Sequence, residues 1–531
     1  MAQWTMPPKE ASTVDQVLAW MAESDIGEGT FLDLRTRKWG PEDVQRLAES
    51  PLTTGLRGLC LSHINVGEAG MTALAFTRHL HRLEALYLYS ARLGDKGISA
   101  LAASPYLGSL TTLDLGKNGI GVEGTRTLAA SANVINLARL SLRQNAISVE
   151  GARALGAAPR LARVNALDVG AQDYSHGVGR LGAQSLLMSP YLKSLVALHL
   201  DANQLGDEAV QAFAVLPRLT SLTSINLDQN VIENGGARTL ALSGFLNGLT
   251  TLSLGGNAIG DSGAQALANT PSTLSLTTFR FDNNVITSAG ATAIAHSPYL
   301  PNLTVLDLKG NALLLANDGI KKTRTGVQAL AASNLPSLEA LDLSLNELGD
   351  DGIAILANSL DLPNLLLLNL GNNEVGDEGV RYLSTTPTMS SVRSLNLGRN
   401  RIGDAGAEWL AHSQHLSLID TLNLSENSIG DKGAWALASS PHLTNLISLD
   451  LSDNKITDVG AQALATSPYL INLISLDLSN NYVGDTGALA LATSSLPQLV
   501  TTLRPRQRIV NPGWRTLGMR LVLDYVPPEP W

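Results

Sequence analysis

Leucines alternate with polar residues along the chain in short segments that recur over most of its length. In one such segment, LDLGKNGIG, Leu113 and Leu115 lie on one side of an extended chain and Asp114 lies on the other. Alanine and leucine at helical spacing follow, which predicts a short helix with one buried side. Ser-Pro then ends the helix, because the residue before a proline disfavours the α conformation. Each segment therefore predicts one strand and one helix.

An asparagine marks the register of these units and recurs at steps of 27 residues wherever a unit carries no insertion. Its positions are Asn118, Asn145, Asn203, Asn230, Asn257, Asn284, Asn311, Asn346, Asn373, Asn400, Asn427, Asn454 and Asn481. Gln172 holds the same place between the second and third of these. We count sixteen well-formed repeats with a degenerate repeat at each end.

The repeat defines the expected organisation of the chain. Residues 31–500 are predicted to form about 17 repeat units, with insertions near residues 173–181 and 312–325. Residues 1–30 are expected to form an N-terminal cap, and residues 501–531 a degenerate last repeat and a C-terminal cap, because the ends of a repeat array need covering.

The glycines of GKNGIG suggest at first a loop that holds a phosphate. A phosphate site needs one such loop. Variants of this stretch instead recur along the chain, among them LSLGGNAIGDSG, LNLGRNRIGDAG and LDLSDNKITDVG. We therefore expect the glycines to serve backbone geometry, and we expect no nucleotide at Gly116–Gly121. The aspartate that follows Ile-Gly in many units, such as Asp404, is expected to be the N-cap of its own helix.

The full unit, L-x-x-L-x-L-x-x-N-x-I-G-D-x-G-A-x-A-L-A-x-S-P-Y-L, resembles the leucine-rich repeat. Its length and its helix are similar to those of the ribonuclease-inhibitor-like class, and a bacterial source is expected. The resemblance implies an α/β solenoid shaped as a horseshoe, with a parallel β-sheet on the concave face and helices on the convex face. It also implies that the asparagines form a buried ladder between turns, and that the protein is a binding scaffold.

Composition and charge narrow the expected function. A net charge of −10 opposes binding to nucleic acid or to an anionic membrane, since both require a basic surface. No cofactor, metal or catalytic site is predicted, because Cys60 lies at an ordinary variable strand position although His63 is close, and His79 and His81 lack further ligands at a suitable spacing. No signal peptide or membrane span is recognised. We expect a monomer that is cytoplasmic, or exported without a classical signal peptide.

Departures from the consensus indicate where a partner binds, because packing already accounts for the consensus residues. The strand residues that face away from the helices vary in the N-terminal half of the chain and are monotonous in the C-terminal half. Candidate partner-binding residues on the strands are Tyr87, Tyr89, Arg143, His199, Asp201, Asp228, Arg280 and Asp282. The two insertions add Tyr174, His176, Lys321, Lys322 and Arg324. Neutral loop growth and drift on an unused surface are the alternative interpretations.

The sequence thus predicts a non-enzymatic scaffold that binds another protein through the concave sheet and the rim loops. The alternative is a bacterial effector or adaptor that recruits a host protein to ubiquitin or signalling machinery, for which no recruitment motif is found outside the repeats. A GTPase-activating protein on the same fold is less favoured, because the C-terminal tail is rich in arginine rather than acidic.

Overall fold

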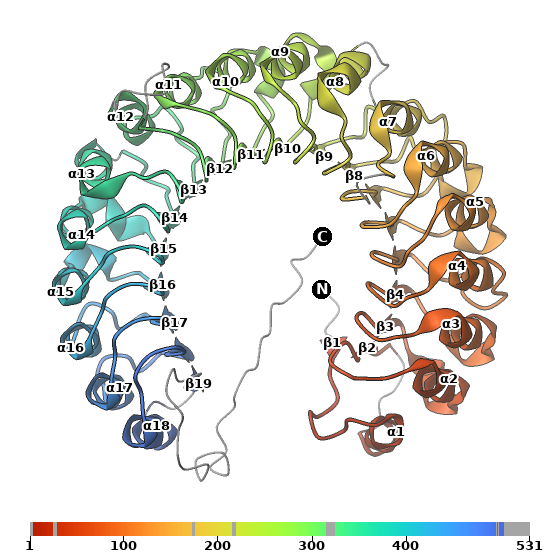
Figure 1. The fold of residues 1–531 in the computed structure, drawn as a ribbon, viewed down its shortest axis with the longest axis horizontal. Helices are drawn as coiled ribbons and strands as arrows, with labels where there is room; N and C mark the ends of the chain where they lie inside the picture. The colour runs from red at the N-terminus through yellow and green to blue at the C-terminus, as the bar shows by residue number, and fades with distance from the viewer. Residues whose placement is uncertain are drawn as a thin grey trace. The chain divides into compact units, whose positions relative to one another are not determined.

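The computed structural model describes residues 4–24, 29–172, 176–214, 219–314, 324–359, 361–494, 496 and 499–503. The chain divides into two compact units, Met1–Ala258 (unit 1) and Ile259–Trp531 (unit 2). In each unit, short strands and helices alternate along the chain, and all neighbouring strands that pair are parallel (Figure 1). The predicted α/β solenoid of leucine-rich-repeat type is therefore confirmed.

The strands of unit 1 follow chain order, each pairing with the next. They are β1 (Trp4–Thr5), β2 (Phe31–Asp33), β3 (Gly58–Cys60), β4 (Ala85–Tyr87), β5 (Thr112–Asp114), β6 (Arg139–Ser141), β7 (Ala166–Asp168), β8 (Ala197–His199), β9 (Ser224–Asn226) and β10 (Thr251–Ser253). The helices are α1 (Val14–Glu23), α2 (Pro41–Glu49), α3 (Gly67–Phe76), α4 (Gly94–Ala102), α5 (Val122–Ala130), α6 (Ser148–Gly156), α7 (Gly179–Leu187), α8 (Gly206–Ala214) and α9 (Asn234–Leu242).

Unit 2 repeats this alternation. Its strands are β11 (Thr278–Arg280), β12 (Val305–Asp307), β13 (Ala340–Asp342), β14 (Leu367–Asn369), β15 (Ser394–Asn396), β16 (Thr421–Asn423), β17 (Ser448–Asp450), β18 (Ser475–Asp477) and β19 (Val500–Thr502). Its helices are α10 (Asp261–Ala268), α11 (Ser288–Ala295), α12 (Thr325–Ala331), α13 (Gly349–Ser359), α14 (Asp377–Ser384), α15 (Asp404–His412), α16 (Asp431–Ala438), α17 (Asp458–Ala465) and α18 (Asp485–Ala492).

Equivalent repeat positions lie side by side in neighbouring strands. Leu113 of β5 pairs with Leu86 of β4 and with Leu140 of β6. Within each unit the strands lie on the concave side and the helices on the convex side (Figure 1). The leucines of the L-x-L segments fill the space between these two layers, where Leu113 is 1% exposed and Leu115 is fully buried. The strand residues between the leucines are left to face the concave side.

The asparagine side chains join each turn to the turn before it, as Asn118 shows. Its Oδ1 accepts the backbone N–H groups of Ala91 and Leu93 at 2.9 and 3.3 Å. Its Nδ2 donates to the carbonyls of Leu88 in the preceding turn and Leu115 in its own turn, at 2.8 and 2.9 Å. The side chain is buried, so these backbone groups have no water to bind in its place.

The prediction that each aspartate caps its own helix was wrong. Gly403 is the N-cap of α15, and Asp404 is the first residue of that helix. Its Oδ1 instead accepts the backbone N–H groups of Gly430 and Gly433, at the start of the next helix, at 2.7 and 2.9 Å. The first N–H groups of a helix have no partner within the helix, and a carboxylate there also opposes the helix dipole favourably. Asp350, Asp377, Asp431 and Asp458 bind the start of the next helix in the same way, so these aspartates cap the helix of the following turn.

The glycines of the unit have steric roles. A Cβ on Gly433 would lie 2.9 Å from Oδ1 of Asp404, so the glycine after each cap makes room for the carboxylate. In the segment GKNGIG, Gly119 has φ = +67°, in the left-handed region that favours glycine. A Cβ on Gly116 would lie 2.6 Å from the ring of Tyr89.

The serine of the Ser-Pro pair binds the C-terminal end of the helix in the preceding turn. Ser467 Oγ donates to the carbonyl of Ala438, at the end of the preceding helix, at 2.5 Å. It also accepts the backbone N–H of Tyr469 at 3.2 Å. The start of α16 is thus stabilised by the preceding turn and its end by the following turn.

The N-terminal residues add an element that the repeat does not predict. Strand β1 pairs with β2, placing Trp4 beside Phe31. Helix α1 begins after Thr13, which forms a capping box with Gln16. Val14 and Val17 of this helix are buried, so its apolar side packs against the array.

Replacing a ladder asparagine should destabilise the fold. Asn400→Ala removes the acceptor of the N–H groups of Asn373 and Val375 and should lower the free energy of unfolding by about 1–3 kcal/mol, measured by urea denaturation. Asn396→Ala, in the same turn, is the control, because the hydrogen bond of its side chain is to Gly398 in its own turn. Equal losses in the two variants would contradict a special role for the ladder.

Replacing an aspartate should destabilise the helix after its own. Asp404→Ala leaves the N–H groups of Gly430 and Gly433 without their acceptor and should cost about 1.5–3 kcal/mol by the same measurement. Hydrogen exchange should accelerate at the start of α16. Glu408→Ala, an exposed acidic residue of the same helix, should change stability by less than about 0.5 kcal/mol. Faster exchange at the start of α15 instead would restore the local-cap interpretation.

Candidate functional site

The concave side of unit 1 carries the most varied set of side chains along the described strands. At the last position of each strand, between the two leucines of the L-x-L segment, β4 to β8 present Tyr87, Asp114, Ser141, Asp168 and His199, which lie side by side in the register of the sheet. Two residues further on, just beyond the strand ends, a second column of side chains stands on the same side. We call these two columns, from β2 to β9, the concave face of unit 1.

An aromatic cluster lies at the N-terminal end of this face. Trp4 contacts Phe31 and Tyr87 edge to face, with ring centroids 5.3 and 5.4 Å apart. Gly58 lies on β3, between β2 and β4, and has no side chain. A Cβ there would lie 2.1 Å from the Phe31 ring. Pairing of β1 with β2 brings Trp4 to the cluster. The sequence analysis missed this residue because the N-terminal strand lies outside the repeat.

Tyr89 lies across the neighbouring turn rather than standing free. Its ring covers Gly116 and contacts the His63 ring edge to face at 5.3 Å. Its hydroxyl donates to Oε1 of Gln144, two turns away. The sequence analysis expected Tyr89 within β4, but the residue lies two positions beyond the end of that strand. These contacts fix the orientation of the ring while leaving it half-exposed.

Arg143 makes an equivalent bridge two turns along. Its guanidinium is 2.7 Å from the Asp201 carboxylate and 3.9 Å from that of Asp168. The Arg143–Asp201 pair covers Gly170, where a Cβ would lie 2.2 Å from Asp201 Oδ1 and 2.8 Å from the guanidinium. The Arg143 side chain is 29% exposed and that of Asp201 is 7% exposed. The pair is therefore largely desolvated and held in one geometry.

The electrostatics of the face are governed by burial. Burial raises the pKa of Asp114 and that of Asp168 to about 6, against the opposing effect of the Gly116 and Gly170 N–H groups. Burial also lowers the pKa of His199, which keeps this imidazole neutral at neutral pH. Carboxyl groups on this face are thus poorly solvated and respond to charges brought near them.

The remaining strand candidates divide between the two units. In unit 1, Asp228 accepts the N–H of Gly255 at 2.6 Å. Arg280 and Asp282 belong to unit 2, where Arg280 is exposed at the end of β11 and Asp282 accepts a hydrogen bond from Asn283 at 2.8 Å. These residues stay candidates.

The insertion candidates are only partly described. Tyr174, Lys321 and Lys322 lie outside the described residues. His176 is exposed, and its backbone carbonyl accepts the N–H of Ser148 at the start of α6 at 3.1 Å. Arg324 forms an exposed ion pair with Asp351 at 3.0 Å.

The concave side of unit 2 is more uniform. Asn369, Asn396, Asn423, Asp450 and Asp477 occupy the last strand position, and each side chain accepts the backbone N–H two residues on. These bonds are local to each turn, although Asn369 also donates to Asp342 of the preceding turn at 2.7 Å. Among the described residues from β14 to β18, no aromatic side chain stands at this last position or two residues on.

Cys60 and His63 do not form a nucleophile and base. The thiol is buried, and burial raises its pKa to about 11, so it stays protonated at neutral pH. Its Sγ lies 3.6 Å from Ser62 Oγ, and His63 contacts the Tyr89 ring instead. Among the described residues, no group of three or more His, Cys, Asp or Glu side chains is placed to hold a metal ion.

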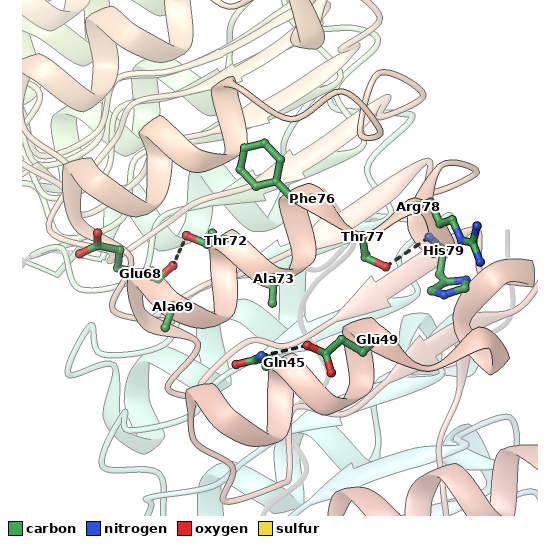
Figure 2. Close-up of a pocket in the computed structure, with 10 residues that line it drawn as sticks. All are labelled: Gln45, Glu49, Glu68, Ala69, Thr72, Ala73, Phe76, Thr77, Arg78 and His79. Atoms are coloured by element: carbon green, nitrogen blue, oxygen red, sulfur yellow. Dashed lines mark hydrogen bonds between the residues drawn. The ribbon is translucent and has the colours of Figure 1, made fainter.

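A shallow groove on the helical side of unit 1 lies between α2 and α3 (Figure 2). Some of its polar side chains bond along their own helices, whereas Thr77 donates to the carbonyl of Ala48 at 2.7 Å. Gln45 donates to Glu49 at 2.9 Å, and Thr72 donates to the carbonyl of Glu68 at 2.8 Å. Phe76 at its end is 50% exposed. In Figure 2 no set of polar groups converges on one point. We therefore interpret the groove as the surface depression between two stacked helices rather than as a binding site.

Sequence profiles of known families match the repeats. A profile described as Leucine Rich repeat matches residues 109–129, 191–214, 218–241, 248–268, 334–357, 361–384, 388–411 and 415–438. A second profile, Leucine Rich repeats (2 copies), matches residues 444–492. No curated protein is similar enough in sequence to count as a match.

Several solved structures are similar to this chain at low sequence identity. They include TLR13 in complex with ssRNA13, with 20% identity, a TM-score of 0.50, and coverage of 89% of this chain and 63% of that chain. The plant peptide hormone receptor RGFR1 in complex with RGF2 shows 17% identity, a TM-score of 0.35, and coverage of 88% and 74%. An internalin (inlF) of Listeria monocytogenes shows 18% identity, a TM-score of 0.30, and coverage of 88% and 94%. The chain therefore spans less than two thirds of the TLR13 chain it resembles.

No helix within the described ranges is sufficiently long and apolar to cross a membrane.

The raised pKa of Asp114 should make stability depend on pH. A carboxyl whose folded pKa is about 6, above its ordinary value of about 3.9, supports folding at low pH and loses that contribution as the pH rises through 6. Asp114→Asn stays neutral at every pH. The stability of this variant relative to the wild type should therefore rise from pH 4.5 to pH 7.5, by about 2–3 kcal/mol at most. Urea unfolding at both pH values measures the difference, with exposed Glu408→Gln as control. A gain at pH 4.5 as large as that at pH 7.5 would contradict the shift.

Proposed function

The chain is a leucine-rich-repeat protein, and on that basis we propose that it is a non-enzymatic scaffold that binds another protein through the concave face of unit 1. One observation carries the proposal. Large aromatic and charged side chains gather on this face and hold one another in place, whereas unit 2 presents small polar residues at the equivalent positions from β14 to β18. Tyrosine, tryptophan and arginine supply most of the binding energy of protein interfaces.

The arrangement of this face favours binding because its anchors are ordered before a partner arrives. Tyr89 is oriented by His63 and Gln144, and Arg143 by Asp201. A side chain that is already fixed loses little conformational entropy on binding, so more of its contact energy appears as affinity. A surface that served only to cover the core would not need such bridges.

We propose that the first insertion extends the face at its rim. His176 is exposed, and the hydrogen bond from Ser148 to its carbonyl ties this part of the insertion to the start of α6. A tethered loop beside a rigid sheet is a common position for binding residues. We include His176 in the proposed surface, with Tyr174 as its neighbour in the sequence. We propose the second insertion, with Lys321, Lys322 and Arg324, as a separate rim contact in unit 2.

The proposal is tested by an alanine scan once a partner has been purified with the full chain as bait. Tyr89→Ala or His176→Ala should weaken binding, with at least one anchor on the face costing about 2 kcal/mol or more, measured by calorimetry. Asn423→Ala, in the uniform part of unit 2, should cost well under about 1 kcal/mol. Thermal melts of each variant separate lost binding from lost folding.

Losses that cluster at Asn369 to Asp477 and spare Tyr89 and His176 would overturn the choice of face. In that case the variety of side chains in unit 1 would reflect drift rather than binding.

A further inference from the structure

The positions of Tyr87, Tyr89 and Asp114 on neighbouring turns make one small niche on the concave face of unit 1. Tyr87 of β4 pairs in register with Asp114 of β5. Two residues on, the ring of Tyr89 lies over Gly116. A single point above Gly116, where a Cβ would stand, is 2.6 Å from Cδ2 of Tyr89 and 3.2 Å from Oδ1 of Asp114. The Tyr89 ring therefore fills the space that a side chain on Gly116 would take, and the Asp114 carboxyl group lies beside this ring.

Within the described part of the chain, uncharged hydrogen-bond donors hold the carboxyl group of the niche, and the Ser141 side chain is one of them. Asp114 accepts the N–H of Gly116 at 2.9 Å, and no Lys or Arg side chain of the described residues forms an ion pair with it. The titratable groups that act on it are Asp168, a second carboxyl, and His63. In the next turn, Arg139 acts electrostatically on Tyr87, and Arg143 is engaged by Asp201. The niche is thus acidic, poorly solvated and lined by aromatic groups.

We propose that this niche receives an arginine side chain of the partner protein, an inference that rests on the proposed function and specifies the chemistry of its ligand. A guanidinium is planar, stacks on aromatic rings and donates hydrogen bonds to a carboxylate. One carboxylate beside tyrosine rings provides both interactions at once. The net charge of −10 of the chain also attracts a basic partner at long range.

Other ligands fit the niche less well. A divalent metal ion prefers several oxygen, nitrogen or sulfur ligands, and among the described residues no metal-binding group of side chains is found. A lysine would satisfy the carboxylate, but its ammonium is compact and strongly hydrated and does not stack on a ring as a guanidinium does. An anionic ligand would face two carboxyl groups, Asp114 and Asp168.

Unit 2 offers a matched control position. Asp450 occupies the same last strand position in β17 and accepts the backbone N–H of the residue two further on. Burial raises the pKa of Asp450 as well. The residue two further on is Ser452, and the register neighbours of Asp450 are Asn423 and Asp477. Asp450 therefore has the carboxyl group of the niche without its tyrosines.

The test uses a random peptide library displayed on phage and selected on the immobilised full-length protein at pH 7.5. Selected peptides are then synthesised and their affinities measured by fluorescence anisotropy. We expect the peptides to contain an arginine whose replacement by glutamine weakens binding about tenfold or more, and whose replacement by lysine weakens it less. Asp114→Asn should cause a loss like that of glutamine, and the two changes combined should cost little more than either alone. Asp450→Asn should leave affinity unchanged.

Tyr89→Leu and Tyr89→Phe separate the ring from the hydroxyl. Tyr89→Leu should weaken binding of the arginine peptide, whereas Tyr89→Phe, which keeps the ring and loses the bond to Gln144, should weaken it less. Circular dichroism and thermal melts verify that each variant is folded. Equal affinities for Tyr89→Leu and the wild type would contradict the stacking role.

The outcomes distinguish this inference from the proposed function. Peptides that bind without arginine, yet lose affinity in His176→Ala or Arg143→Ala, would overturn the niche and leave the concave face of unit 1 as the binding surface. Peptides that lose affinity only in Asp450→Asn would overturn both. Selection of no peptide, or affinity unchanged by Asp114→Asn, would overturn the niche.

Discussion

Backbone polar groups that are buried between stacked turns set the main constraint on this fold. Each turn carries irregular backbone from a three-residue strand to a helix across the interior, where N–H and C=O groups cannot reach water. The asparagine side chain meets this constraint, because its amide has both donors and an acceptor and Asn118 uses them on its own turn and the preceding one. A side chain of fixed length that spans two turns also sets their spacing and register. The leucines can then pack in level layers, and very short strands suffice.

The same dependence on neighbours holds at the helices. Helices of eight residues, such as α10, are too short to be stable alone, and their unsatisfied terminal groups are a large share of the backbone. Asp404 binds the start of the next helix and Ser467 the end of the preceding one. Glycine follows each aspartate cap because the carboxylate occupies the space of a Cβ. The I-G-D-x-G motif of one turn thus provides the contacts that this turn makes with its neighbours.

The side chains that face the concave side have more freedom, since the leucine layers and the asparagine ladder do not use them, although Asp228 accepts the N–H of Gly255 in the next turn. In unit 1 this freedom permits Tyr89 and Arg143 to lie across glycines and reach partners two turns away. The arrangement leaves carboxyl groups such as Asp114 poorly solvated, which opposes stability at neutral pH. Functional sites in general combine groups of perturbed pKa with a local loss of stability. The poorly solvated carboxyl groups and the ordered aromatic rings of this surface resemble such sites.

The sequence by itself determined the repeat, the order of strand and helix, and which residues are buried, because a period of 27 residues brings equivalent positions together whatever the curvature of the array. It also marked Tyr89 and Arg143 as departures from the consensus. It did not determine their partners: Gln144 and Asp201 lie 55 and 58 residues further along the chain, and such contacts depend on the rise between turns and on the glycine that lies between them. The recipient of each aspartate cap and the docking of Trp4 through β1 were likewise decided by how neighbouring turns approach. Local patterns specify elements, whereas contacts across turns arise only once those elements are packed.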